Sequence, residues 1–325
     1  MIYEFNSKII KSLCLLLFLQ SCAYFNTFYN AENHYNIAEE LRIKDISSPL
    51  SADAIKEYGK AIEKSEKVLT EYPDSDYIEQ AIFLKGKAHF FRKEYEIAKE
   101  LFFRLKDSDD ILFANEAQYW LALCNWKYLK PQPAINSLEA LIPKTESKDL
   151  QSRAYLALGQ IYFENGDSNN AFYFLNLGAE ISDNRTTREQ IYFQIAELSY
   201  ERMMYKKSLE NYKKVISNSI SIDRIIESNL KIVKIYRLSG DLDKSKSAIQ
   251  VLLLDDNFLS IKPQLELELI KIDLGKENIG FAIENLDLIA QDNQDTKIAV
   301  EAYYILSDLY LESPNLDFER SIFFM

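Results

Sequence analysis

Apolar positions along most of this 325-residue chain recur at helical spacing. Between residues 80 and 310, large apolar side chains follow one another at intervals that place them on one face of a helix. Each run gives way to a short polar break, such as Asn165-Gly166-Asp167 or Ser239-Gly240-Asp241. The pattern predicts pairs of amphipathic helices joined by short turns, without a sheet.

The predicted helix pairs form a tandem repeat of about 37 residues. One position in the first helix of each pair is small in most repeats, and successive examples are 36 or 37 residues apart. They are Gly86, Ala122, Gly159, Ala196, Val233, Ile270 and Ser307. Twelve residues later stands a second column of small residues: Ala98, Ala134, Ala171, Ser208, Ser245 and Ala282. Because small side chains let two helices approach, we expect these columns to lie where the helices of each pair touch.

The second helix of each pair is expected to begin at a capping residue. Asp167, Asp241, Asn278 and Asn315 occupy one equivalent offset in four repeats. Side chains of this type accept hydrogen bonds from the exposed amides of a helix start. The repeat unit is therefore predicted to be helix, short turn, helix.

These columns resemble the tetratricopeptide repeat. In one unit the match consists of Tyr155, Gly159, Tyr162 and Ala171. The resemblance implies an all-α solenoid in which each hairpin buries its apolar face against its neighbours. It extends over residues 25–325, which would hold about seven to eight repeats, the last one incomplete.

The first 22 residues have the plan of an export signal. Lys8 and Lys11 precede an apolar stretch over residues 13–19. That stretch is too short to span a bilayer, which takes about 20 apolar residues. The following segment, Leu19-Gln20-Ser21-Cys22, resembles the bacterial lipobox. The resemblance implies cleavage before the cysteine and acylation of its thiol.

The expected mature protein is then a helical-repeat solenoid over residues 22–325, after removal of a signal peptide over residues 1–21. Acyl chains on Cys22 would anchor it, because two or more chains give stable membrane attachment. The alternative is an ordinary cleaved signal in which the cysteine occurs by chance. The aromatic residues that follow, such as Phe25 and Phe28, either lie at the membrane interface or pack as the first helix of the solenoid, and we favour the second interpretation.

The segment Glu71-Tyr72-Pro73-Asp74 and the hairpin after it are similar to the longer repeats of bacterial periplasmic proteins. Among these are the outer-membrane assembly lipoprotein BamD and Tol-associated periplasmic repeat proteins. The resemblance implies a scaffold that binds other envelope proteins or peptides. Ala23 after the cysteine, in place of an Asp, favours the outer membrane facing the periplasm.

Charge and reactive residues narrow the function classes. The net charge of −12 disfavours nucleic acid, which is bound through clustered Lys and Arg. The chain has two histidines, His34 and His89, in different predicted helices, and its eight glycines are dispersed. Neither a metal site nor a phosphate loop is predicted, so we expect no enzyme, no cofactor and no metal. Cys124 has no basic neighbour in sequence and is expected to be a small buried side chain.

Glycan binding is the alternative function. The SusD-like outer-membrane nutrient receptors are also helical-repeat lipoproteins, but they carry long insertions with aromatic platforms. Here the repeats are uninterrupted, and the chain has only two tryptophans, Trp120 and Trp126. A protein-binding scaffold is therefore the favoured interpretation.

Two further columns in the first helices are not needed for hairpin packing. They lie three residues before and four residues after the small position, so they share one helical face. Aromatic members in the earlier repeats are Phe83, Phe90, Tyr119, Trp126, Phe163, Phe193 and Tyr200. In the tetratricopeptide family the first helices line the concave surface, so these residues are predicted to form a groove for a peptide or partner helix. Polar residues expected nearby are Lys87, Gln160, Glu197 and Lys234. The alternative is that they only pack adjacent first helices together.

Overall fold

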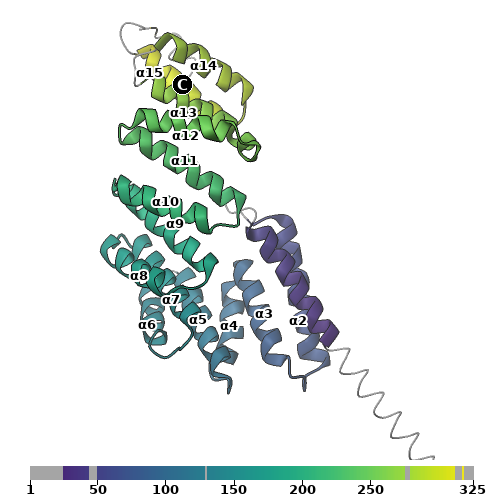
Figure 1. The fold of residues 1–325 in the computed structure, drawn as a ribbon. Helices are drawn as coiled ribbons and strands as arrows, with labels where there is room; N and C mark the ends of the chain where they lie inside the picture. Colours follow the sequence, from purple (N-terminus) through teal and green to yellow (C-terminus); the bar gives the residue numbers. More distant parts are fainter. Residues whose placement is uncertain (1–24, 44–49, 129, 275–278, 312–316, 318–325) are drawn as a thin grey trace, which may run out of the picture. The chain divides into compact units, whose positions relative to one another are not determined.

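The computed structural model describes residues 25–43, 50–128, 130–274, 279–311 and 317. The predicted signal peptide and Cys22 lie outside the described residues. Every regular element within the described residues is a helix, as the sequence pattern predicts. Helices follow one another in antiparallel pairs (Figure 1).

The helices fall into two alternating sets. The first helices cover residues 25–43, α3 Ile78–Phe91, α5 Ile111–Lys127, α7 Lys148–Glu164, α9 Arg185–Glu201, α11 Ile222–Leu238, α13 Lys262–Leu274 and α15 Lys297–Leu311. The second helices are α2 Ala52–Glu71, α4 Tyr95–Leu105, α6 Pro131–Leu141, α8 Ser168–Ile181, α10 Tyr205–Asn218, α12 Leu242–Leu253 and α14 Ile279–Asp292. A 3₁₀ helix, η1 Asp256–Ile261, precedes α13. The described residues thus contain seven hairpins and the first helix of an eighth, which confirms the predicted solenoid fold class.

The chain forms two compact units, Met1–Gln194 and Ile195–Met325. In the first, one apolar cluster extends from Ile82 on α3 to Ile161 on α7 and includes residues of the three helices between them, α4, α5 and α6. In the second, separate clusters link α11 to α13 and α13 to α15. Because each cluster draws residues from adjacent hairpins, a single hairpin does not contain a complete core.

The turn within a hairpin has the same left-handed geometry in four repeats. Lys93, Gly166, Met203 and Gly240 all have positive φ, between 56° and 82°. At Gly166 the backbone N–H donates to Phe163 O at 2.9 Å, and the next N–H, of Asp167, donates to Tyr162 O at 2.9 Å. This pair of bonds satisfies carbonyl groups at the end of the first helix and reverses the chain.

The predicted small columns lie at the closest approach of the two helices. A Cβ atom on Gly86 would lie 2.8 Å from Cε1 of Phe102, so only glycine fits there without a shift. Where serine replaces alanine in the second column, its hydroxyl donates across the hairpin: Ser208 Oγ bonds Ala196 O at 2.9 Å, and Ser245 Oγ bonds Val233 O at 2.9 Å. The hydroxyl is satisfied, so its burial carries no unpaired polar group.

Two of the four predicted caps lie within the described residues, and each stands at the N-cap of a second helix. Asp167 accepts a hydrogen bond from the Asn170 amide at 3.0 Å. Asp241 occupies the equivalent N-cap position of α12 but makes no side-chain cap bond; its Oδ2 instead accepts a hydrogen bond from Lys244 Nζ at 2.9 Å. Asn278 and Asn315 lie outside the described residues.

The segment after the predicted lipidation site packs as the first helix. Residues 25–43 are helical, and the Phe28 ring stacks on Tyr77 with centroids 5.0 Å apart. Tyr35 and Tyr58 meet edge to face at 5.7 Å inside the first hairpin. This agrees with the favoured interpretation of Phe28 as part of the solenoid.

Candidate functional site

The aromatic columns predicted for a groove begin on α3 and α5 in the first unit. Tyr119 is buried, and Phe83, Phe90 and Trp126 are half-buried. The Phe90 ring meets Trp120 edge to face at 5.1 Å. At this end of the surface the columns thus contribute to packing between adjacent first helices.

The Phe83 ring also has core partners. It contacts Phe102 of its own hairpin and Phe113 at the start of α5, both with centroids 5.8 Å apart. Each contact is edge to face, the arrangement that aromatic pairs favour. Phe83 therefore has a structural role whether or not a partner touches it.

The surface is more open toward the ends of α5 and α7. Trp126 Nε1 donates to Glu164 Oε2 at 2.8 Å, and Lys127 Nζ lies 3.5 Å from the centre of the Trp126 ring. The half-buried Phe163 ring, one residue before Glu164, makes no ring contact within the described residues. Trp126 and Phe163 thus combine apolar area with adjacent charge.

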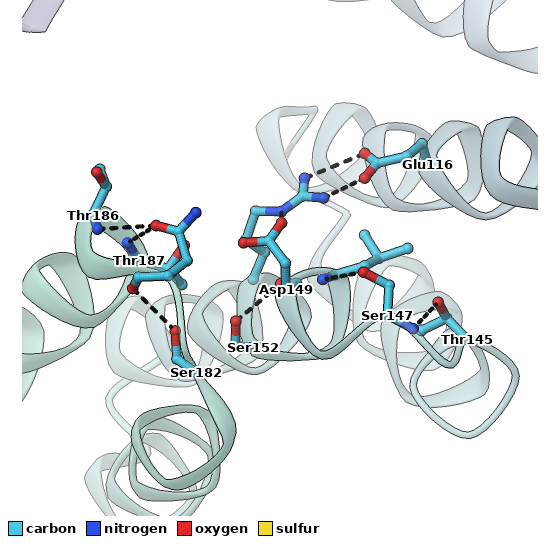
Figure 2. A network of polar contacts seen from close by, with 11 residues as sticks. Glu116, Thr145, Ser147, Asp149, Ser152, Ser182, Thr186 and Thr187 are labelled. Carbon is cyan, nitrogen blue, oxygen red and sulfur yellow. Dashed lines mark hydrogen bonds and ion pairs between the residues drawn. The ribbon is translucent and has the colours of Figure 1, made fainter.

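An arginine on α7 ties this surface to α5 (Figure 2). The Arg153 guanidinium is bound by both carboxylate oxygens of Glu116, and its Nε donates to Asp149 Oδ2 at 2.8 Å. Its Cζ also lies 4.9 Å from the centre of the Tyr119 ring. Burial disfavours the charged form, but the carboxylates outweigh it and raise the pKa of Arg153. The charge of Arg153 is therefore already neutralised within the chain.

Lys87 on α3 is a second cation on the same surface, and its surroundings differ. Its Nζ lies 4.5 Å from the centre of the Tyr35 ring, 5.7 Å from Phe83 and 5.8 Å from Trp120. Within the described part of the chain it has no carboxylate at ion-pair distance. Burial lowers the pKa of this ammonium. The Lys87 ammonium is therefore still available to form an ion pair with an anionic group of a ligand.

In the second unit the same helical face is more charged. The half-buried Tyr200 lies under Lys231 Nζ at 4.9 Å, and that ammonium pairs with Glu197 at 2.9 Å. Glu197 also accepts a hydrogen bond from the buried Tyr212 hydroxyl. Phe193, which belongs to the other groove column on α9 and lies within the first unit, is buried at 9% exposure.

A small cavity of about 230 Å³ opens between α11, α13 and α15. Its lining combines apolar Leu230 and Leu267 with Lys234, Gln264 and Lys271. Lys271 Nζ is held by Glu268 at 2.8 Å and by Glu301 at 2.7 Å, whereas Lys234 is exposed and has no ion pair within the described residues. Gln264 Oε1 is buried and lacks a hydrogen-bond donor there. Among the described residues, the cavity thus presents the Lys234 ammonium and the Gln264 carbonyl oxygen to a ligand.

The ion pairs that cross between first helices were not predicted from the sequence. Glu116 and Arg153 are 37 residues apart and occupy the same position in successive repeats. Opposite charges at one position of adjacent repeats are therefore the signal that identifies such a pair. Trp120, by contrast, lies next to a predicted groove residue yet is itself a core residue, stacked on Phe102 at 5.7 Å.

The reactive residues are not gathered in one place. His34 pairs with Glu57 at 2.6 Å in the first hairpin, and His89 pairs with Glu94 at the turn of the second. Cys124 is fully buried, as predicted, and burial raises the pKa of its thiol to about 12. Among the described residues, no group of three or more His, Cys, Asp or Glu side chains is arranged to hold a metal ion. A membrane-spanning helix is likewise not found in this part of the chain.

Comparisons with known proteins locate the fold but not a function. No protein-family profile and no curated protein matches the chain. Among solved structures, the apo form of RapI is similar with a TM-score of 0.63 and 12% identity, over 92% of this chain and 97% of RapI. The apo form of the quorum sensor NprR from B. thuringiensis is similar with a TM-score of 0.59 and 10% identity, over 99% of this chain and 92% of NprR.

A signal-transduction ATPase with a tetratricopeptide-repeat sensor from Pyrococcus horikoshii gives a TM-score of 0.62 and 16% identity. The alignment covers 90% of this chain but only 46% of the ATPase, so the chain spans about half of that protein's length. At these identities the likeness shows the fold alone. The fold is the tetratricopeptide-repeat solenoid.

Proposed function

We propose that this protein is a scaffold that binds a segment of a partner polypeptide along the face of its first helices, and that it catalyses no reaction. One observation carries the proposal: in the first unit Trp126 and Phe163 remain half-buried at a position of the first helices that hairpin packing does not require, and in the second unit Tyr200 remains half-buried at the equivalent position. Partly exposed aromatic side chains with charged neighbours are the usual anchors of protein interfaces. The tetratricopeptide-repeat fold supports the same function.

The unpaired groups on this face specify the chemistry of the partner. Lys87 on the first-helix face of the first unit and Lys234 on that of the second each have an ammonium without a carboxylate partner among the described residues, and each is suited to an acidic side chain. Gln264 Oε1 is an acceptor suited to a backbone N–H. The favoured ligand is therefore a peptide or helix with apolar anchors and acidic residues, although the net charge of the chain is −12.

We further propose that the scaffold is lipid-anchored through Cys22 in the outer membrane, facing the periplasm, and acts in envelope assembly. The proposal is supported by the lipobox-like segment that ends at Cys22. Replacement of Cys22 by alanine should release the protein from membranes, because the acyl chains are the only strong anchor expected. Membrane fractionation measures this, and persistence of the variant in membranes after a high-salt wash would contradict the proposal.

The proposed binding face is tested with Trp126→Ala and Tyr200→Ala. Tyr173→Ala is the matched control, because Tyr173 is 58% exposed on a second helix. Proteins retained by the detergent-solubilised wild type are quantified by mass spectrometry, and each variant is also melted. We expect both test variants to lose the same retained proteins while the control keeps them, with little loss of stability.

Two results would overturn the proposed face. If both test variants melt early by about 3–5 kcal/mol and lose no partner selectively, the rings are core residues. If the purified protein retains no polypeptide but binds sugars on a glycan array, and Trp126→Ala abolishes that signal, the protein is a glycan-binding lipoprotein instead.

A further inference from the structure

A groove of about 530 Å³ runs along the hairpin formed by α11 and α12. Its floor and walls include Asn229, Tyr236, Ala248 and Val251, and they expose more apolar than polar surface. It shares no lining residue with the smaller cavity between α11, α13 and α15. The groove is therefore separate from the first-helix face to which the proposed function is assigned.

The same place in an earlier repeat is filled by the chain itself. In the hairpin of α7 and α8, the Phe174 ring stacks on Tyr162 with centroids 5.4 Å apart and an interplanar angle of 9°. Its other neighbour, Tyr155, lies at 6.2 Å and 26°. Phe174 thus fills the space between two tyrosines of the first helix.

Two repeats later, the equivalent residues leave that space open. Each is 74 residues further along the chain: Asn229 replaces Tyr155, Tyr236 replaces Tyr162, and Ala248 replaces Phe174. One of the two tyrosines is thus retained, but the ring that stacked on it is absent. Asn229 lines the space but does not fill it, because its Nδ2 donates back to Ile225 O of its own helix at 2.9 Å.

One side of the groove's rim is apolar, and on the other side the charge of Lys244 is neutralised by an ion pair. Val251 is 68% exposed on α12, so its side chain is available for contact. Lys244 Nζ lies 5.9 Å from the centre of the Tyr236 ring, but Asp241 holds it at 2.9 Å. The groove therefore favours an uncharged ring over a charged side chain.

We propose that this groove receives an aromatic side chain from a partner polypeptide, which stacks on Tyr236 as Phe174 stacks on Tyr162. The arrangement of the earlier repeat defines the guest: a flat ring, held between the first and second helices. Its contacts with Ala248 and Val251 would be apolar. A single such ring is an anchor for a longer segment, since buried aromatic residues dominate binding at protein interfaces.

The test uses N-acetyl-phenylalanine amide as the probe and the full chain as the receptor. Protein-observed NMR titration measures binding, with N-acetyl-cyclohexylalanine amide as the non-aromatic comparison. We expect the phenylalanine probe to shift signals of Tyr236 and Ala248 and to bind about two- to tenfold more tightly than the cyclohexyl probe, because ring stacking adds to area burial.

Substitutions of residues that line the groove test whether the probe binds there. Ala248→Phe supplies the ring that Phe174 provides in the earlier repeat, so it should fold and should abolish probe binding. Asn229→Tyr narrows the same space and should weaken binding at least about tenfold. Gln250→Phe is the matched control, because residue 250 is exposed on α12 outside the groove lining, and it should bind the probe as the wild type does.

Three outcomes would overturn the inference. The first is a wild-type protein that shows no shift at Tyr236 or binds both probes equally. The second is an Ala248→Phe variant that unfolds or still binds, or an Asn229→Tyr variant that binds normally. The third is a concentration-dependent dimer that Ala248→Phe abolishes in sedimentation, which would make the guest a second copy of this chain and not a separate partner.

Discussion

Gly159 on α7 and Leu175 on α8 are in such close contact that a Cβ atom on the glycine would lie 2.5 Å from Cγ of the leucine. Leu175 is itself buried at 1% exposure. The closeness of the two helices in this hairpin therefore depends on the missing side chain. It explains physically why the first small column of the repeat contains glycine at this position.

Gly159→Ala should destabilise the protein by about 1–3 kcal/mol, because an added methyl group overpacks the hairpin. Gly280→Ala is the control: a Cβ there meets nothing within 4 Å, so the substitution should be neutral or slightly stabilising. Urea unfolding measures both. Equal stability of the two variants would show that the hairpin spacing does not depend on Gly159.

The Cys124 thiol should resist alkylation in the folded protein. Its side chain is fully buried, and burial raises its pKa to about 12, so almost no thiolate is present at neutral pH. Iodoacetamide labelling followed by mass spectrometry should modify residue 124 only after denaturant is added. Rapid labelling under native conditions would mean that α5 opens locally.

Glu268 should make the second unit sensitive to acid. Burial raises the pKa of this carboxyl, but Lys271 and Arg237 outweigh burial, and the net pKa lies below its ordinary value of 4.5. A lowered pKa in the folded state means that the contribution is present above pH 4.5 and is lost as the pH falls through the lowered value.

Glu268→Gln should therefore reduce the free energy of unfolding at pH 7 by about 1.5–3 kcal/mol and flatten its decline below pH 4.5. Glu63→Gln serves as the control, because its carboxylate is 71% exposed and, among the described residues, pairs with the adjacent Lys64 alone. An exposed pair contributes at most about 1 kcal/mol. Urea titrations between pH 7 and pH 3 compare the variants, and parallel pH curves for all of them would contradict the assignment.

Much of the fold could be predicted from the spacing of apolar and small residues. The period of about 37 residues identifies the hairpins because contacts between the first and second helix depend on the same positions of the repeat, as Gly86 against Phe102 and Gly159 against Leu175 show. Cap chemistry was less predictable. Asp241 has the right residue type at the right offset, but the nearby Lys244 competes for its carboxylate.

The candidate surface was only partly predictable. Helical spacing places Tyr119 and Trp126 on one face, but it does not distinguish the buried ring from the half-buried one, because burial depends on the neighbouring helices. The groove beside Tyr236 also escaped the sequence analysis. The groove exists because Ala248 stands where the earlier repeat has the large Phe174. Such a replacement is visible only when the repeats are compared position by position.

The central claim, that the first-helix face contacts a partner polypeptide, is tested most directly by photo-crosslinking within one hairpin. p-Benzoylphenylalanine is placed at Phe163 on α7 or at Tyr173 on α8, in cells that produce the protein. The account predicts a discrete crosslinked adduct from residue 163 and none from residue 173. An adduct from residue 173 alone, or no adduct from residue 163, would contradict it.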